Sequence, residues 1–126
     1  MFSLTSSNTY YLYRGYTDMR KSFDGLSGLV QNQMGRNPLS GEVFLFINRK
    51  KDSIKLLRWE NGGYVVYYKR LEKGTLTVPK SLSEGNYSSI GWPELVLMIE
   101  GILVEKYRKK VRYSLAEMGK NILKNP

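Results

Sequence analysis

The chain lacks the two residues that most often hold a transition metal, because none of its 126 residues is cysteine or histidine. Without cysteine it has no disulfides and no thiolate metal sites. Without histidine it also lacks the commonest general base and the other usual ligand of zinc. A carboxylate site for magnesium is the one metal site that this composition leaves conceivable. We therefore expect no cofactor.

Acidic residues are also scarce, since 11 Asp and Glu stand against 20 Lys and Arg, for a net charge of +9. Such a balance favours a polyanionic partner, either nucleic acid or an anionic membrane surface. Long apolar runs are lacking as well: none approaches the length of a bilayer span, and the first residues do not resemble a secretory signal. We therefore expect a cytoplasmic protein with no membrane partner.

Clustered carboxylates are missing too. The acids considered for catalysis fall on different predicted elements: Asp18, Asp24, Asp52 and Glu72. A nuclease needs carboxylates close together to hold its metal ions, and no serine or threonine stands in a recognisable nucleophile motif. A hairpin turn accounts for Asn61-Gly62-Gly63, so no glycine-rich phosphate loop remains. These absences favour a protein that is not an enzyme and has no small-molecule substrate.

The segments that are present predict strands in most of the first 80 residues. Four of them are rich in β-branched and aromatic residues and are bounded by turn residues: 10–14, 42–48, 53–60 and 64–71. A further strand is predicted over 75–78, where Pro79 ends it at a sheet edge, and 80–89 is read as a serine-rich loop.

Two helices are expected beside these strands. The first is predicted to follow a turn at Gly15, with Thr17 as its N-cap, and to end in the segment 35–38. Its core stripe at helical spacing is Met19, Phe23, Leu26, Val30 and Met34. The second starts at Trp92-Pro93, and its buried stripe is Leu95, Met98, Ile99 and Ile102.

These elements predict an α+β fold, with an antiparallel β-meander of about four to five strands and two helices packed on one face. A chain of this length fits one domain, which we place at residues 1–105. Residues 106–126 are predicted to be a basic, loosely ordered C-terminal tail.

The hairpins predict the register of the meander. A two-residue turn at Asn61-Gly62 places Trp59 opposite Tyr64 and, further along, Lys55 opposite Tyr68; a four-residue first turn places Phe46 opposite Lys55. One face of the sheet is then aromatic and carries Phe44, Phe46, Lys55, Leu57, Trp59, Tyr64, Val66 and Tyr68. The other is mainly aliphatic, and although either face can be the core, we favour the aliphatic one beneath the first helix.

Positive charge concentrates on this meander, with nine basic and three acidic residues between Arg49 and Lys80, a local net of +6. Basic side chains neutralise phosphates, and exposed aromatic rings stack on unpaired bases. The predicted nucleic-acid contacts are Arg20, Lys21, Arg49, Lys50, Lys51, Lys55, Arg58, Lys69 and Arg70, and the rings for stacking or for a protein partner are Trp59, Tyr64 and Tyr68. The alternative is that the rings fill the core and the charges are merely solvated.

Arg20 and Lys21 are expected in the first turn of a helix, where exposed amides favour an anion such as phosphate. An alternative reading has Asp18 already in that position, or has Asp18 and Asp24 paired with Arg20 or Lys21, so that these charges only shape the helix start.

Several strings of the sequence recur together in one family. Residues 17–26 read TDMRKSFDGL, residues 43–52 read VFLFINRKKD, and residues 68–72 read YKRLE. In this order they resemble the small TnpB accessory proteins, which are encoded beside the transposase in transposons of the insertion sequence 66 family. The resemblance covers roughly residues 10–104 and departs from the family pattern near 76–79.

The resemblance implies a role in DNA transposition. It suggests an accessory protein that assists a separate transposase, by binding DNA at the transposon ends or by stabilising the transposase–DNA assembly. Its partners would then be DNA, the transposase and other transposon-encoded proteins. The alternatives are an adaptor that docks on the transposase without direct DNA readout, and an RNA-binding protein that uses the aromatic sheet face.

Overall fold

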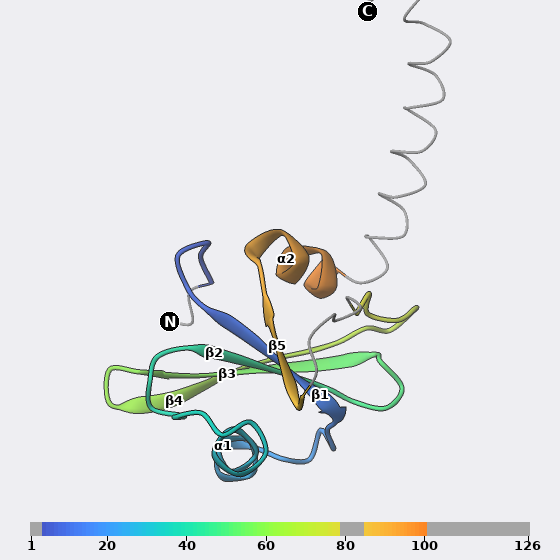
Figure 1. Cartoon of the computed structure of the whole chain (residues 1–126). Coiled ribbons are helices and arrows are strands. Elements are labelled where there is room, and N and C mark those ends of the chain that lie inside the picture. The colour runs from blue at the N-terminus through green and yellow to red at the C-terminus, as the bar shows by residue number, and fades with distance from the viewer. Residues whose placement is uncertain (1–3, 79–84, 101–126) are drawn as a thin grey trace, which may run out of the picture.

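The computed structural model describes residues 4–78 and 85–100, which form a five-stranded sheet with one helix on each side (Figure 1). The elements are β1 (Tyr10–Tyr16), α1 (Phe23–Asn32), β2 (Val43–Ile47), β3 (Ser53–Glu60), β4 (Gly63–Arg70), β5 (Tyr87–Ile90) and α2 (Trp92–Glu100). Their order in the sheet is β4-β3-β2-β1-β5. This architecture confirms the predicted α+β class.

The meander has the predicted register. Trp59 lies opposite Tyr64, Lys55 opposite Tyr68, and Phe46 opposite Lys55. The turn between β3 and β4 has positive φ at both central residues, 50° at Asn61 and 85° at Gly62. Two-residue turns of this kind match the twist of the flanking strands, so they hold a hairpin in a single register.

β1 joins the sheet by a parallel pairing, which the sequence did not predict. It pairs in parallel with β2, and α1 forms the crossover between these two strands. Gly15 continues β1 instead of making a turn, so that expectation was wrong. The reason is pairing: after a register shift that follows Leu12, β1 pairs with β2 again at Tyr16, and the Thr17 amide donates to the Ile47 carbonyl at 2.8 Å.

The fifth strand was predicted in the wrong place. Residues 75–78 form no strand, although Leu76 is buried and its amide donates to the Lys51 carbonyl at 2.7 Å. The strand is β5, which lies partly within the segment read as a serine-rich loop and pairs antiparallel with β1. Two serines in four residues give β5 a weak intrinsic preference for strand, so its pairing with β1 decides the conformation.

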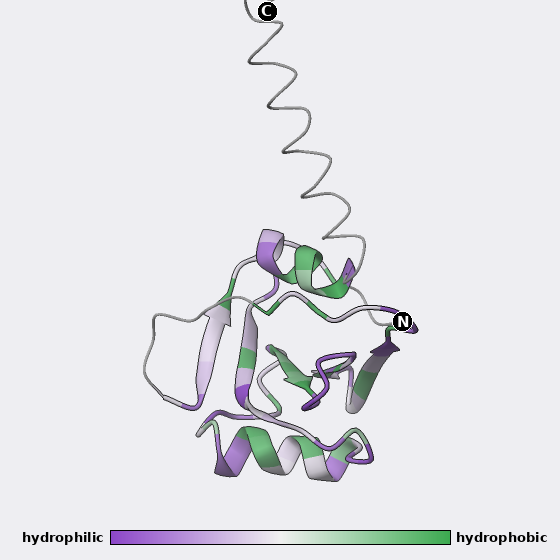
Figure 2. Ribbon diagram, turned by 90° about the vertical axis from the view of Figure 1, so that its right-hand side faces the viewer, coloured by the Kyte–Doolittle hydropathy of each residue, from purple (hydrophilic) through white to green (hydrophobic). Residues whose placement is uncertain are grey.

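Both faces of the sheet are core, so the expectation of two helices on one face was wrong. α1 packs on the aromatic face, where Leu26 and Val30 lie against Phe44 and Phe46, so the expectation that the aliphatic face lies beneath the first helix was also wrong. α2 packs on the aliphatic face, where Leu95 and Met98 join a cluster that includes Leu45, Leu56 and Tyr10. All five residues of β2 are consequently buried, as expected of a central strand covered on both sides. Figure 2 shows apolar and polar residues interspersed along α1, as in a helix with one buried side.

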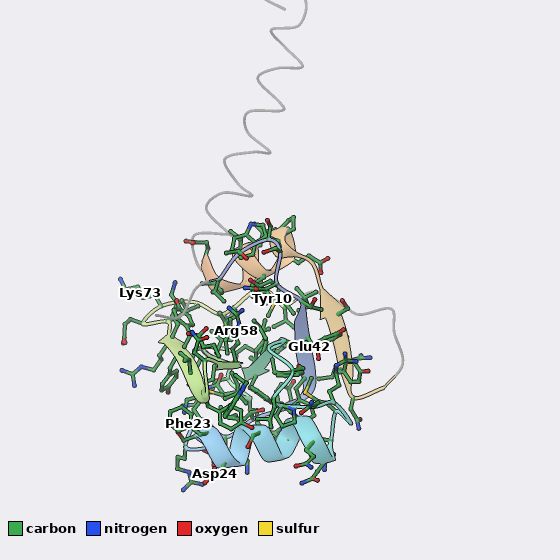
Figure 3. All side chains as sticks on the ribbon, turned by 90° about the vertical axis from the view of Figure 1, so that its left-hand side faces the viewer. Tyr10, Phe23, Asp24, Glu42, Arg58 and Lys73 are labelled. Carbon is green, nitrogen blue, oxygen red and sulfur yellow. The ribbon has the colours of Figure 1, made fainter. Side chains whose placement is uncertain are left out.

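α1 begins later than predicted. Its N-cap is Ser22, and Thr17, the expected cap, is 3% exposed with no hydrogen-bond partner for its hydroxyl within the described residues. Leu26, Val30 and Met34 are buried as predicted. Phe23 is not buried: it is the first residue of α1 (Figure 3). Its exposed fraction is 45%.

α2 begins at Trp92-Pro93 as predicted, and Leu95 and Met98 are buried. Ile99 packs partly against the same cluster. Ile102 and the predicted tail at 106–126 lie outside the described residues. Within the part of the chain that the structure describes, no helix is long and apolar enough to cross a membrane.

Candidate nucleic-acid interface

Two segments that are far apart in the sequence meet at one end of the sheet. The chain leaving β1 runs beside the turn between β2 and β3, and residues 16–19 and 48–50 line the same open hollow of about 620 Å³. Asp52 and Ser53 complete the turn side, and Tyr68 and Arg70 of β4 complete the opposite side. We call this feature the β2–β3 hollow. Its two long segments belong to the strings TDMRK and NRKKD.

Hydrogen bonds of the Asn48 and Asp52 side chains stabilise the turn between β2 and β3. The Asn48 side-chain oxygen accepts from the amides of Asp52 and Ser53, both at 3.1 Å, and its Nδ2 donates to the Asp52 carboxylate at 2.6 Å. This hydrogen bond from Asn48 lowers the pKa of Asp52. The charge of Lys50 also lowers this pKa, but no ion pair joins the two side chains, and the turn's basic side chains face solvent.

Those basic side chains are Arg49, Lys50 and Lys51, and all three are exposed. Among residues 4–78 and 85–100, the side chains of Lys50 and Lys51 make no hydrogen bond or ion pair. The Arg49 guanidinium lies over the Tyr16 ring, 5.0 Å from its centroid. Three neighbouring cations thus share one tight turn, and none is paired with an acid in the described structure.

Arg20 is exposed but paired. Its guanidinium donates to both carboxylate oxygens of Asp18, the shortest distance being 2.7 Å, and the Arg20 amide donates to the same carboxylate. These bonds lower the pKa of Asp18 to about 2. The pairing of Asp18 with Arg20, one of the two alternatives left open by the sequence, is therefore present. Both residues precede α1, as does Lys21, so none lies in its first turn.

Three predicted contacts are instead occupied by the protein's own groups. Lys55 is 7% exposed, and its Nζ donates to the carbonyls of Met19 and Lys21, both at 2.7 Å. Lys69 donates to the Ile99 carbonyl at 2.9 Å, and Arg58 donates to the Gly41 carbonyl at 3.2 Å. Because these cations are occupied, we leave them out of the contact set proposed below.

Arg70 differs from these three. Its side chain is 63% exposed and pairs with Glu72 at 3.2 Å. It lines the hollow from β4.

The aromatic residues divide in a similar way. Trp59 and Tyr64 are partly buried and contact each other edge to face, with centroids 5.0 Å apart, beside the turn between β3 and β4. Tyr68 is 51% exposed and lines the hollow, and so does Tyr16, at 52%. Sequence reasoning missed Tyr16, although its position directly before Thr17 and the TDMRK string was a usable signal.

A second charged cluster serves the fold. Arg36 donates to both oxygens of Glu42, at 2.7 and 3.2 Å, and lies over the Tyr11 ring at 4.0 Å. It also donates to the Tyr87 hydroxyl, so it joins the segment after α1 to strands β1 and β5. Among the described residues, no group of three or more acids is placed to hold a metal ion.

Comparison with known proteins decides the family. Residues 8–109 match the family described as IS66 Orf2 like protein. The chain belongs to this family. The match includes every residue of the β2–β3 hollow, and it confirms the resemblance to insertion sequence 66 proteins. Membership in the IS66 Orf2-like family associates the chain with transposition.

Two curated relatives come from Sinorhizobium fredii, and both are named only as uncharacterized proteins. One, y4hO, is 35% identical over 89 residues, which are 70% of this chain and 75% of the relative. The other, y4jC, is 29% identical over 62 residues, which are 49% of this chain and 53% of the relative. No solved structure matches the chain.

Proposed function

We propose that this protein is a non-catalytic accessory factor of DNA transposition that binds DNA at the ends of its element through the β2–β3 turn. The observation that carries the proposal is the set of three exposed cations on one turn, Arg49, Lys50 and Lys51, none of which forms an ion pair with an acid of the described residues. Cations of this kind neutralise backbone phosphates and release the counterions bound there. Family membership supplies the transposon context.

Other exposed cations extend this surface. Arg70 lines the hollow. Arg20 directly follows residues 16–19, which form one wall of the hollow. Their side chains are 63% and 92% exposed despite their carboxylate partners. Exposed ion pairs contribute little to stability, because water and salt screen them, so both guanidinium groups can exchange a carboxylate for a phosphate at little cost.

One observation favours a second candidate, an adaptor that docks on the transposase. Three aromatic side chains of the described residues are about half exposed: Tyr16 (52%), Phe23 (45%) and Tyr68 (51%). Aromatic side chains of this kind commonly anchor protein interfaces. If the protein is such an adaptor, its positive charge assists association with the transposase and does not recognise DNA.

The test is a titration of the purified protein into labelled duplexes that carry the terminal sequence of the transposon or a scrambled sequence. Each titration is repeated at several salt concentrations. An Arg49/Lys50/Lys51→Ala variant should lose most of the affinity. It should also lower the slope of log K against log salt by roughly 2 to 3, since each phosphate contact contributes about 0.9.

The matched control keeps the charge and changes the side chains: Arg49→Lys, Lys50→Arg and Lys51→Arg together. It should bind nearly as well as the wild type if phosphate neutralisation is the mechanism. Absence of binding by the wild type at low salt would contradict the proposal and favour the adaptor. Equal affinity of the alanine variant and the wild type would show that the β2–β3 turn does not contribute to DNA binding.

A further inference from the structure

The hollow contains a feature that phosphate binding does not require, namely two half-exposed tyrosine rings. Tyr16 ends β1 and Tyr68 belongs to β4, and the two strands between them are β2 and β3. The turn that joins β2 and β3, with Arg49 and Lys50, therefore lies between the two rings, and all four residues line one hollow. Large rings are usually buried more deeply, so their placement in a concave basic site calls for a ligand with an aromatic face.

A cation lies over each ring. The Lys55 ammonium lies over the Tyr68 ring at 4.6 Å and is itself held by two backbone carbonyls. The Arg49 guanidinium lies over the Tyr16 ring at 5.0 Å. Since Lys55 is 7% exposed whereas Tyr68 is 51% exposed, the cation covers the inner side of this ring and leaves the outer side to solvent. Such a ring is a preformed platform that loses little freedom when a planar group stacks on it.

We propose that the β2–β3 hollow binds an unpaired nucleotide at the end of a DNA strand, with its base stacked on Tyr68 or Tyr16 and its phosphate bound by Arg49 and Lys50. Bases inside a duplex are already stacked on one another and cannot reach rings in a hollow, whereas unpaired bases can. The volume of about 620 Å³ is in the range of pockets that bind small organic groups.

This inference rests on the proposed function, because it makes the DNA end, and not the duplex alone, the preferred ligand. It names single-stranded DNA as the ligand because the family associates the chain with DNA transposition, and RNA, which differs by its 2′-hydroxyls, is an outcome of the test.

The experiment compares two labelled DNAs of identical duplex sequence, one blunt and one with a short single-stranded extension of thymidines. We expect the wild type to bind the extended DNA roughly tenfold more tightly, a factor in the range of one base–aromatic stack. Tyr16→Leu and Tyr68→Leu should each reduce this preference several-fold, because each should weaken binding of the extended DNA more than binding of the blunt duplex. Tyr68→Phe, which keeps the ring, should retain the preference.

Phe23→Leu is the matched control, because Phe23 is similarly exposed but does not line the hollow. It should bind both DNAs as the wild type does, and thermal unfolding should show that every variant is folded. Equal wild-type affinity for the two DNAs, with steep salt dependence, would overturn the nucleotide inference and leave the proposed DNA binding intact. Stronger binding of an extension made of RNA would also overturn it. If the wild type bound neither DNA, both the nucleotide inference and the proposed DNA binding would be contradicted.

Discussion

The basic residues of the strands and those of the β2–β3 turn carry the same charge but differ in their surroundings, because the former are bonded to the protein and the latter face solvent. On the strands, Lys55 and Lys69 donate to backbone carbonyls of distant segments. On the turn, Lys50 and Lys51 are exposed and, within the described residues, contact no acid. A net charge alone therefore overstates the charge available to a ligand, because part of it stabilises the fold. The difference predicts that strand variants lose stability and turn variants lose binding.

The largest expected effect is at Lys55. Replacing it with methionine, Lys55→Met, keeps much of the buried stem but leaves the carbonyls of Met19 and Lys21 without their donor. Because hydrogen bonds from a charged group are strong and Lys55 itself is buried, we expect the free energy of unfolding to fall by roughly 3 kcal/mol. Urea denaturation measures this change.

The matched control is the same substitution on the turn, Lys50→Met. It should leave the urea midpoint close to that of the wild type, because exposed surface substitutions usually change stability little. If Lys55→Met were as stable as Lys50→Met, the distinction between strand and turn cations would be lost.

Arg36 offers the next largest effect. Arg36→Gln removes the two bonds to Glu42 and the contact with the Tyr11 ring, which together connect the segment after α1 to the sheet. We expect a loss of roughly 2 kcal/mol, because this pair is largely shielded from water. Arg20→Gln is the control, since it breaks an equally short pair whose arginine is 92% exposed. It should lower the thermal unfolding midpoint much less than Arg36→Gln does, because solvent screens the exposed pair, and a similar loss in both variants would contradict the role of burial.

A smaller effect should appear in the pH dependence of stability. The Arg20 side chain, with help from its amide, lowers the pKa of Asp18 from 3.8 to about 2. A lowered pKa in the folded state means that this contribution is present above pH 3.8 and is lost as the pH falls towards 2. Asp18→Asn should therefore flatten the stability curve in this interval. The test is to record the denaturation midpoints of Asp18→Asn and of the wild type from pH 5 downwards. If the two curves of midpoint against pH had the same shape, the prediction would be contradicted.

The register of the hairpins could be predicted from sequence because it depends on local chemistry. Asn61-Gly62 accepts the positive φ angles of a tight turn, and alternation along β3 and β4 then determines which residues face each other. β5 could not be predicted in this way. Its four residues become a strand only through pairing with β1, which is more than 70 residues away in the sequence.

The candidate site was predictable to a similar extent. The exposure of Arg49, Lys50 and Lys51 follows from their position on a short turn. The burial of Lys55 does not follow, because its partners are backbone carbonyls that the chain before α1 brings to it. Tyr16 was missed for the same reason, since its neighbours in the hollow come from β4 and from the turn between β2 and β3.

The smallest change in stability, and the most direct test of the turn, is expected for Lys50→Ala. Its side chain is exposed and, in the described part of the chain, has no hydrogen-bonding partner, so the folded protein loses no contact that a denaturation curve would detect. A single phosphate contact should nevertheless disappear, which lowers the slope of log K against log salt by about 0.9. Binding titrations at four or more salt concentrations resolve this change. If stability fell while the slope stayed the same, Lys50 would act like the strand cations, and the contrast between the two regions would not hold.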